Sequence, residues 1–239
     1  MSRSVRIALA SILLLANGDR ASAKTPDISL DWVGVYEMSL CRAPKNEIQF
    51  AAAKKEAEQR LPEFQRAWAN HGPLWLNETA KLVGHPFKFK EALGTLIVCQ
   101  DHPWGTSYPL TINLDWFLSA YDGKYRNHPR WEELFAERVY HEVLHRYIRD
   151  LLGPGKGEPF RETPLMRRYA NEPLLTRTHL HVMAIERLLF QRLGKADLPP
   201  LLRADHQHAP AYARAYEIVD EVGADAVLAD LRQQANARH

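Results

Sequence analysis

The sequence has little cysteine, and this limits the chemistry that can be expected of it. Only Cys41 and Cys99 occur among its 239 residues. Sequence ties no particular histidine to either thiol, so nothing supports a cysteine nucleophile. In an oxidising compartment two such cysteines often pair, and closing a loop of nearly sixty residues would stabilise the fold by roughly 4 kcal/mol. We therefore predict a Cys41–Cys99 disulfide, with two buried free thiols as the alternative.

The chain also lacks an apolar run long enough for a permanent membrane anchor. Ile7 to Ala16 is apolar over only ten residues, whereas a spanning helix needs about 20. Arg3 and Arg6 precede the run, and small residues ending at Ala23 follow it, which is the pattern of a cleaved secretory signal. No cysteine follows the run to carry a lipid. We expect residues 1–23 to be a signal peptide cut near Ala23, and the mature protein to be periplasmic or secreted.

The mature chain lacks an excess of either charge. The whole sequence has 31 basic and 29 acidic residues. Segment 1–23 holds three of the basic and one of the acidic residues, so 28 of each remain. A neutral surface gives no reason to expect nucleic acid or an anionic membrane as a partner. There is no internal repeat, and residues 24–239 are enough for a single domain with a helical C-terminal extension over about 195–239.

Strand-like patterns come early in the sequence and helical patterns late. Residues 27–41, 86–92, 94–100 and 108–117 are typical of strands, the last three of an antiparallel meander. Helices are predicted over about 46–60, 62–70, 73–83, 129–152, 165–170, 172–193, 209–221 and 224–235. This order predicts an α+β fold, with a small antiparallel sheet followed by a mostly helical half.

The strongest chemical signal is a His-Glu-x-x-His motif at residues 141–145. His141 and His145 are four residues apart on the predicted helix 129–152, so both imidazoles point the same way and can hold one tetrahedral zinc ion. Glu142 can take a proton from a zinc-activated water that attacks a carbonyl. At 100° per residue the two histidines lie between a wide apolar face and a polar strip that includes Glu142 and Arg149. This placement suits a cleft beside a largely buried helix.

The motif and its position after a small sheet resemble the zincin metallopeptidases. The resemblance implies a zinc-dependent hydrolase that cleaves a peptide or amide bond, with a peptide or protein as substrate. In zincins a later helix or turn supplies the third zinc ligand. The metzincin extension is absent, because Ile148 and Leu151 stand where that pattern has glycine and histidine.

The third ligand is therefore expected on the predicted helix 172–193. Glu172, His179 and Glu186 are seven residues apart and fall on nearly one line of that helix. We favour His179 as the third ligand, and we expect one of the two glutamates to orient a metal-binding histidine by a hydrogen bond from outside the coordination shell. The gluzincin branch uses a glutamate on the following helix, so Glu172 and Glu186 stay candidates. His181 points in a different direction.

Several further roles are left open by the sequence. The donor to the developing oxyanion could be Tyr147, Arg168, Tyr169 or His181. The glycine-rich segment 153–164 is a candidate lid, and the strand in LTINLDW, residues 110–116, could bind an extended substrate by strand addition. His206 and His208 could bind metal weakly, although a solvated turn is favoured for them.

Three hypotheses for the function follow. The first is an exported zinc metallopeptidase with His141, His145 and His179 as ligands and Glu142 as general base. The second is a non-catalytic, zinc-stabilised binding module in which Glu172 or Glu186, together with His179, closes the coordination sphere. The third is a metal-free periplasmic interaction protein. We favour the peptidase. The oligomeric state is not predicted, and other divalent ions suit imidazole sites as well.

Overall fold

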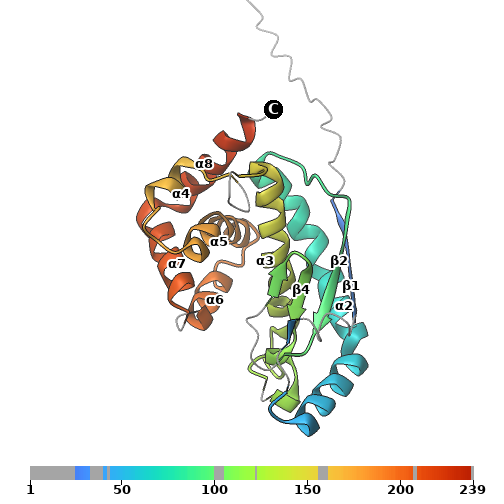
Figure 1. Ribbon diagram of the computed structural model, residues 1–239. Helices are drawn as coiled ribbons and strands as arrows, with labels where there is room; N and C mark the ends of the chain where they lie inside the picture. Colours follow the sequence, from blue (N-terminus) through green and yellow to red (C-terminus); the bar gives the residue numbers. More distant parts are fainter. Residues whose placement is uncertain are drawn as a thin grey trace, which may run out of the picture.

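The computed structural model describes residues 25–32, 40–41, 44–99, 105–121, 123–155, 161–206 and 209–237. Within them a four-stranded sheet is followed by a mostly helical half, which confirms the α+β class (Figure 1). The strands are β1 (Asp27–Trp32), β2 (Glu91–Ile97), β3 (Gly105–Ser107) and β4 (Leu110–Asn113). The helices are α2 (Glu47–Val83), α3 (Trp131–Leu152), α4 (Pro164–Arg168), α5 (Leu174–Arg192), α6 (Leu198–His206), α7 (Pro210–Val222) and α8 (Ala224–Asn236), and two 3-10 turns, η1 (Asp115–Phe117) and η2 (Ser119–Tyr121), lie between β4 and α3.

The sheet is mixed, so the prediction of an antiparallel meander was wrong. Its strand order is β1-β2-β4-β3. β1 pairs with β2 and β2 with β4 in parallel, and only β3 runs antiparallel to its neighbour β4. β1 and β2 can be parallel because the long helix α2 connects them, which is the crossover that parallel strands require. β3 is thus one of the two edge strands of the sheet, and β1 is the other.

The sequence pattern predicts a break between two strands at Gly94, but Gly94 lies inside β2. Residues 91–97 form one strand, and residues 86–90 before it are irregular. A Cβ at position 94 would come within 2.6 Å of Leu30 Cδ2. Glycine here therefore makes room for the Leu30 side chain of the neighbouring strand β1 and does not mark a turn.

One continuous helix replaces the three that were predicted between residues 46 and 83. α2 includes both Pro62 and Pro73 within its 37 residues. Asn46 caps its start by accepting from Gln49 N, and Gly84 ends it with a positive φ of 81°. Large side chains along α2 are buried, among them Phe64 and Trp75. Packing of this face stabilises the helix through two residues that would interrupt an isolated one.

The hydrophobic core is built in two adjoining parts. α2 and α3 pack against each other and against the sheet, and α5 packs on α3 from the other side. A second cluster lies among α4, α5, α7 and α8. In Figure 1 α3 therefore stands between the sheet and the late helices. The extension predicted for about 195–239 forms α6, α7 and α8, which pack around α5; α6 had not been predicted.

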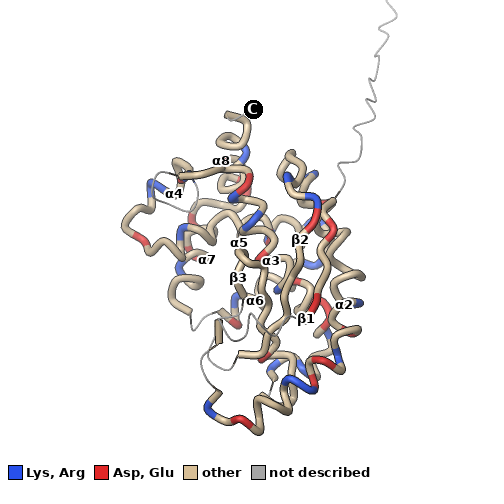
Figure 2. The backbone as a smooth tube through the Cα atoms, turned by 45° about the vertical axis from the view of Figure 1, so that its right-hand side comes forward, with Lys and Arg blue, Asp and Glu red and all other residues tan. Residues whose placement is uncertain are grey.

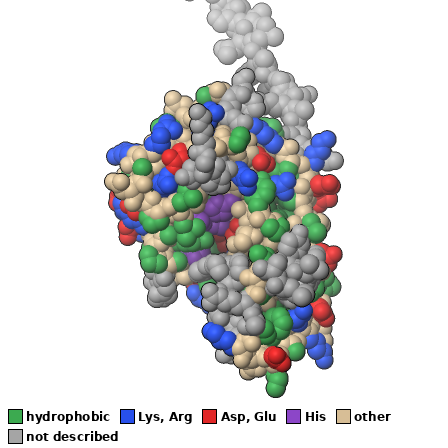
Figure 3. Space-filling view, viewed as in Figure 1, with side chains coloured by type: hydrophobic (Ala, Val, Ile, Leu, Met, Phe, Trp, Pro, Cys, Tyr) green, Lys and Arg blue, Asp and Glu red, His purple; other side chains and the backbone are tan. Residues whose placement is uncertain are grey.

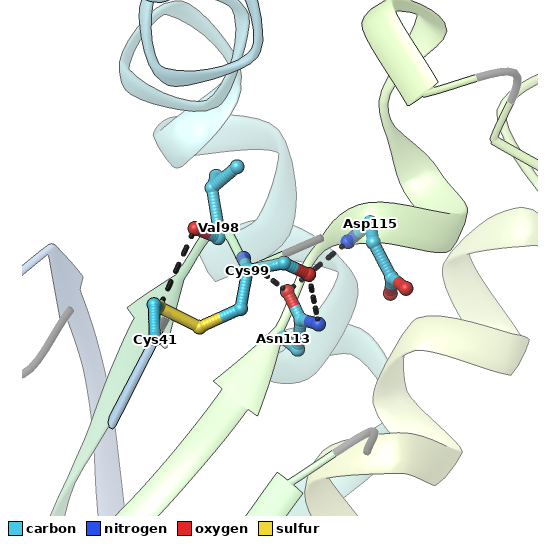
Figure 4. The surroundings of a disulfide bond; sticks show 5 residues. All are labelled: Cys41, Val98, Cys99, Asn113 and Asp115. Carbon is cyan, nitrogen blue, oxygen red and sulfur yellow. Dashed lines mark hydrogen bonds between the residues drawn. A yellow bond between two sulfur atoms is a disulfide. The ribbon is translucent and has the colours of Figure 1, made fainter. Parts of the chain in front are cut away.

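The predicted disulfide between Cys41 and Cys99 is present, with a sequence separation of 58 and a Cα–Cα distance of 5.3 Å. Asn113, at the end of β4, holds the backbone beside it (Figure 4). Cys99 N donates to Asn113 Oδ1 at 3.0 Å, and Asn113 Nδ2 donates to Cys99 O at 2.8 Å. These bonds join the chain after β2 to β4, so the disulfide fixes residues near position 41 to the sheet.

Among the helices that the structure describes, none is long and apolar enough to cross a membrane. Basic and acidic residues are interspersed along the long helix α2 (Figure 2). The predicted signal peptide, residues 1–23, and the strand prediction for residues 33–39 lie outside the described residues.

Candidate metal centre

Helix α3 carries the His-Glu-x-x-His motif and is largely buried, as predicted. It begins with acidic residues in its first turn, where they interact favourably with the helix dipole, and Gly153 follows its last residue. His141 is 6% exposed and Glu142 is also 6% exposed, while His145 is half-buried. The site therefore lies largely within the fold.

Helix α5 brings a third imidazole to the pair. The Nε2 atom of His145 lies 3.3 Å from Nε2 of His141 and 3.1 Å from Nε2 of His179. Of the candidates for a third ligand, His179 is the one that joins this group of ring nitrogens, all within 4.8 Å of one another. Figure 3 shows histidine side chains in a hollow near the middle of this face. We name these three residues the histidine cluster.

The far nitrogens of two of these rings have hydrogen-bond partners. His179 Nδ1 donates to the backbone carbonyl of Leu175 at 2.6 Å, since a carbonyl can only accept. His141 Nδ1 lies 2.8 Å from Glu186 Oε1. Such partners fix the tautomer and orientation of metal-binding histidines. Glu186 thus stands behind a histidine and does not face the centre of the cluster.

The three Nε2 atoms are better arranged to bind one metal ion than to hydrogen-bond to one another. With Nδ1 protonated on His141 and His179, both Nε2 atoms present lone pairs toward His145 Nε2. A single N–H on His145 could satisfy only one of them. In tetrahedral coordination, Zn–N bonds of 2.0–2.1 Å place ligand nitrogens about 3.3 Å apart, which is close to the two observed separations.

The histidines are electrostatically suited to hold a cation. Burial lowers the pKa of His179 to about 3 and that of His145 well below its ordinary value, and it lowers the pKa of His141 as well. The three rings are therefore neutral at neutral pH, which is the form that binds metal.

Behind the cluster lies a pair of buried carboxyl groups. Glu137 on α3 and Glu186 on α5 hydrogen-bond to each other, and burial raises the pKa of both. The pair therefore retains a proton at neutral pH. Sequence reasoning considered Glu186 but missed Glu137, although its position four residues before His141 places it on the same face of α3.

Glu142 lies beside the edge strand of the sheet. A Cβ on Gly105, the first residue of β3, would come within 2.8 Å of both Glu142 Oε1 and the backbone oxygen of Thr111 on β4, so glycine makes room for this carboxylate and for the paired strand. Burial raises the pKa of Glu142 to about 7. A carboxyl group with a pKa near neutrality can both accept and return a proton.

A pocket of about 340 Å³ opens beside the cluster. It lies between β3 and the late helices, with Gly105, Thr106, Ser107, Tyr108, Glu142, His145, Arg149, Leu175, Thr178, His179 and Tyr212 along its walls. Sequence reasoning missed Tyr212 on α7, whose ring centroid is 4.2 Å from that of His179. Burial raises the pKa of Tyr212, so its hydroxyl keeps its proton. Nothing in the sequence near residue 212 indicates this contact.

Several other candidates lie elsewhere. Glu172 precedes α5 and pairs with Arg214 at 2.8 Å, so it does not reach the cluster. Tyr147 donates to the carbonyl of His85, and His181 Nε2 lies 3.0 Å from Asp230 Oδ2. Arg168 and Tyr169 contact each other at the end of α4, with 5.7 Å between the guanidinium carbon and the ring centroid. None of these is among the described residues that line the pocket.

Two of the remaining expectations need correction. LTINLDW includes β4, which has β2 on one side and β3 on the other and so has no free edge; β3 lines the pocket instead. His206 is buried, 6% exposed and packed against Tyr212, because the unpredicted helix α6 carries it inward. His208 and residues 156–160 of the candidate lid lie outside the described residues.

Comparisons with protein-family models, with curated proteins and with solved structures find no match for this chain. The class of protein therefore has to be inferred from the site.

Proposed function

We propose that this protein is a zinc-dependent hydrolase of the zincin type that cleaves a peptide or amide bond. The observation that carries the proposal is the convergence of three Nε2 atoms, from His141, His145 and His179, beside an open pocket that Glu142 also lines. Catalytic zinc sites combine three protein ligands with an open position.

Zinc, when bound by the cluster, would supply a Lewis acid and lower the pKa of water. Glu142 is the general base in this proposal. Its carboxylate lines the same pocket as the histidines, and a pKa near 7 lets it take a proton from water and pass it to the leaving amine.

Tyr212 is our candidate for the donor to the developing oxyanion. It lines the pocket against His179, and its protonated hydroxyl can donate a hydrogen bond. The edge strand β3 can bind an extended substrate by backbone pairing, because its outer side has no strand partner among the described residues.

We further propose that the protein works outside the cytoplasm, in the periplasm or as a secreted protein. The predicted signal segment and the Cys41–Cys99 disulfide support this location, since structural disulfides persist in oxidising compartments.

The test uses the mature chain loaded with zinc and a library of fluorogenic peptides. We expect one zinc per chain and cleavage that Glu142→Gln abolishes while zinc stays bound. Glu132→Gln is the matched control, because Glu132 lies in the first turn of the same helix and away from the pocket. Stoichiometric zinc without any cleavage would favour the non-catalytic, zinc-stabilised binding module. Absence of zinc binding would leave the metal-free interaction protein.

A further inference from the structure

The pocket beside the histidine cluster is lined by one positively charged side chain, that of Arg149, which has no role in the proposed reaction. Apart from Glu142 and the two neutral histidines, the described residues of its wall are uncharged, with Arg149 as the exception. A guanidinium is charged at every physiological pH. The pocket therefore presents a fixed positive charge to whatever enters it.

Arg149 lies one helical turn beyond the metal ligands. His141, His145 and Arg149 follow at intervals of four residues on α3, so their side chains share one face, with neighbouring Cβ atoms about 6 Å apart. A group bound by Arg149 would thus lie one or two residues along an extended peptide from the reacting bond.

The guanidinium rests on a tyrosine ring. Its central carbon lies 4.1 Å from the ring centroid of Tyr108, which follows β3. Tyr108 in turn donates to Asp150 Oδ1 at 3.4 Å. This stacking orients the planar guanidinium and leaves its N–H groups for a ligand.

Arg149 makes no ion pair with any carboxylate among the described residues. By contrast, Arg177 on α5, two residues before His179, pairs with the carboxylate of Glu162. An oriented and half-buried guanidinium is a binding group for carboxylates.

We propose that Arg149 determines the substrate specificity of this site by binding a carboxylate of the peptide substrate, on the Tyr108 side of the reacting bond. The inference rests on the proposed function. β3 runs from Gly105, beside Glu142, toward Tyr108. In a substrate strand antiparallel to β3, an acidic side chain before the reacting bond reaches Arg149. In a substrate strand parallel to β3, Arg149 is reached by an acidic side chain on the C-terminal side of the reacting bond or by the C-terminal carboxylate.

The test scans Glu, Gln and Lys through each position of a cleaved parent peptide, with a free or an amidated C-terminus. At one position we expect the peptide with Glu to have a kcat/KM about tenfold higher than the peptide with Gln, or the peptide with a free C-terminus to exceed the amidated one by that factor. A hydrogen bond between charged groups that are partly exposed contributes a free energy equivalent to about this factor. Arg149→Gln should lose the preference, and Arg149→Glu should shift it to Lys. Arg167→Gln is the control, because Arg167 on α4 donates to the carbonyl of Glu162 and is not among the lining residues.

Failure of this inference differs from failure of the proposed function. Cleavage that is indifferent to substrate charge, or a preference that survives in Arg149→Gln, overturns the role of Arg149 and leaves the peptidase standing. Should no peptide be cleaved, the same peptides are titrated into zinc-loaded Glu142→Gln protein by fluorescence polarisation. Equal affinity for Glu and Gln peptides, or no binding, then overturns the inference as well.

Discussion

Zinc is expected to stabilise the fold, because its proposed ligands come from two different helices. His141 and His145 lie on α3 and His179 lies on α5. An ion that binds only the folded state contributes about 2.7 kcal/mol when its free concentration is 100 times Kd. For a chain of this size each kcal/mol corresponds to about 2–4 °C in Tm. Saturating zinc should therefore raise Tm by about 5–10 °C.

The variant that tests this reasoning is His179→Gln. It removes the one ligand that α5 supplies, so the zinc-dependent increase in Tm should disappear. The assay is thermal unfolding in a chelator and in buffered zinc, with Kd measured on the same protein so that the expected increase is fixed beforehand. His71→Gln is the control, because His71 is half-buried on α2 and stacks on Trp75.

Two results would refute the reasoning. One is an equal zinc-dependent increase in Tm for the wild type and His179→Gln. The other is a measured Kd that predicts an increase which thermal unfolding does not show. Either result would mean that the ion does not join α3 to α5.

Three further predictions concern other parts of the structure. Gly105→Ala should lower kcat/KM by about a hundredfold with zinc retained, because its Cβ would displace the Glu142 carboxylate; steady-state kinetics and metal analysis check this. Asp230→Asn should cost about 1–3 kcal/mol of unfolding free energy at pH 7, because Asp230 accepts from a backbone N–H and an imidazole. These contacts lower the pKa of Asp230 in the folded protein. The stabilisation by its carboxylate is therefore fully present above the pKa that Asp230 has in the unfolded chain, and it is lost as the pH falls through the lower pKa of the folded state. In urea titrations between pH 7 and 3, the unfolding free energies of the wild type and the variant should become equal as the pH falls. Replacing both Cys41 and Cys99 by serine should cost about 4 kcal/mol, because the disulfide closes a long loop, as denaturant unfolding would measure.

Each of these predictions has a result that contradicts it. Unchanged kinetics in Gly105→Ala would mean that the Glu142 carboxylate does not need its observed place. A pH-independent difference for Asp230→Asn would mean that its ionisation is not linked to folding. Equal stability of the double serine variant and the oxidised wild type would show that the loop is constrained by other contacts.

The sequence alone determined the elements with strong local signals. Residues 129–152 have a helical period and a glycine stop, and α3 forms almost over that range. Four-residue spacing on one helix makes His141 and His145 neighbours whatever surrounds them, because helix geometry is local. The seven-residue line through Glu172, His179 and Glu186 also put the third imidazole and the carboxyl group that contacts His141 on one helix, although α5 begins only after Glu172.

The tertiary structure alone decided which partners these elements meet. Packing kept α2 continuous through two prolines, and the crossover that α2 makes set β1 parallel to β2. Neither effect can be read from a short window, because both depend on contacts between residues far apart in the chain. The same holds for Tyr212 and Arg149, one on a late helix and the other beside an edge strand, whose places along one pocket result from how α3, α7 and β3 pack together.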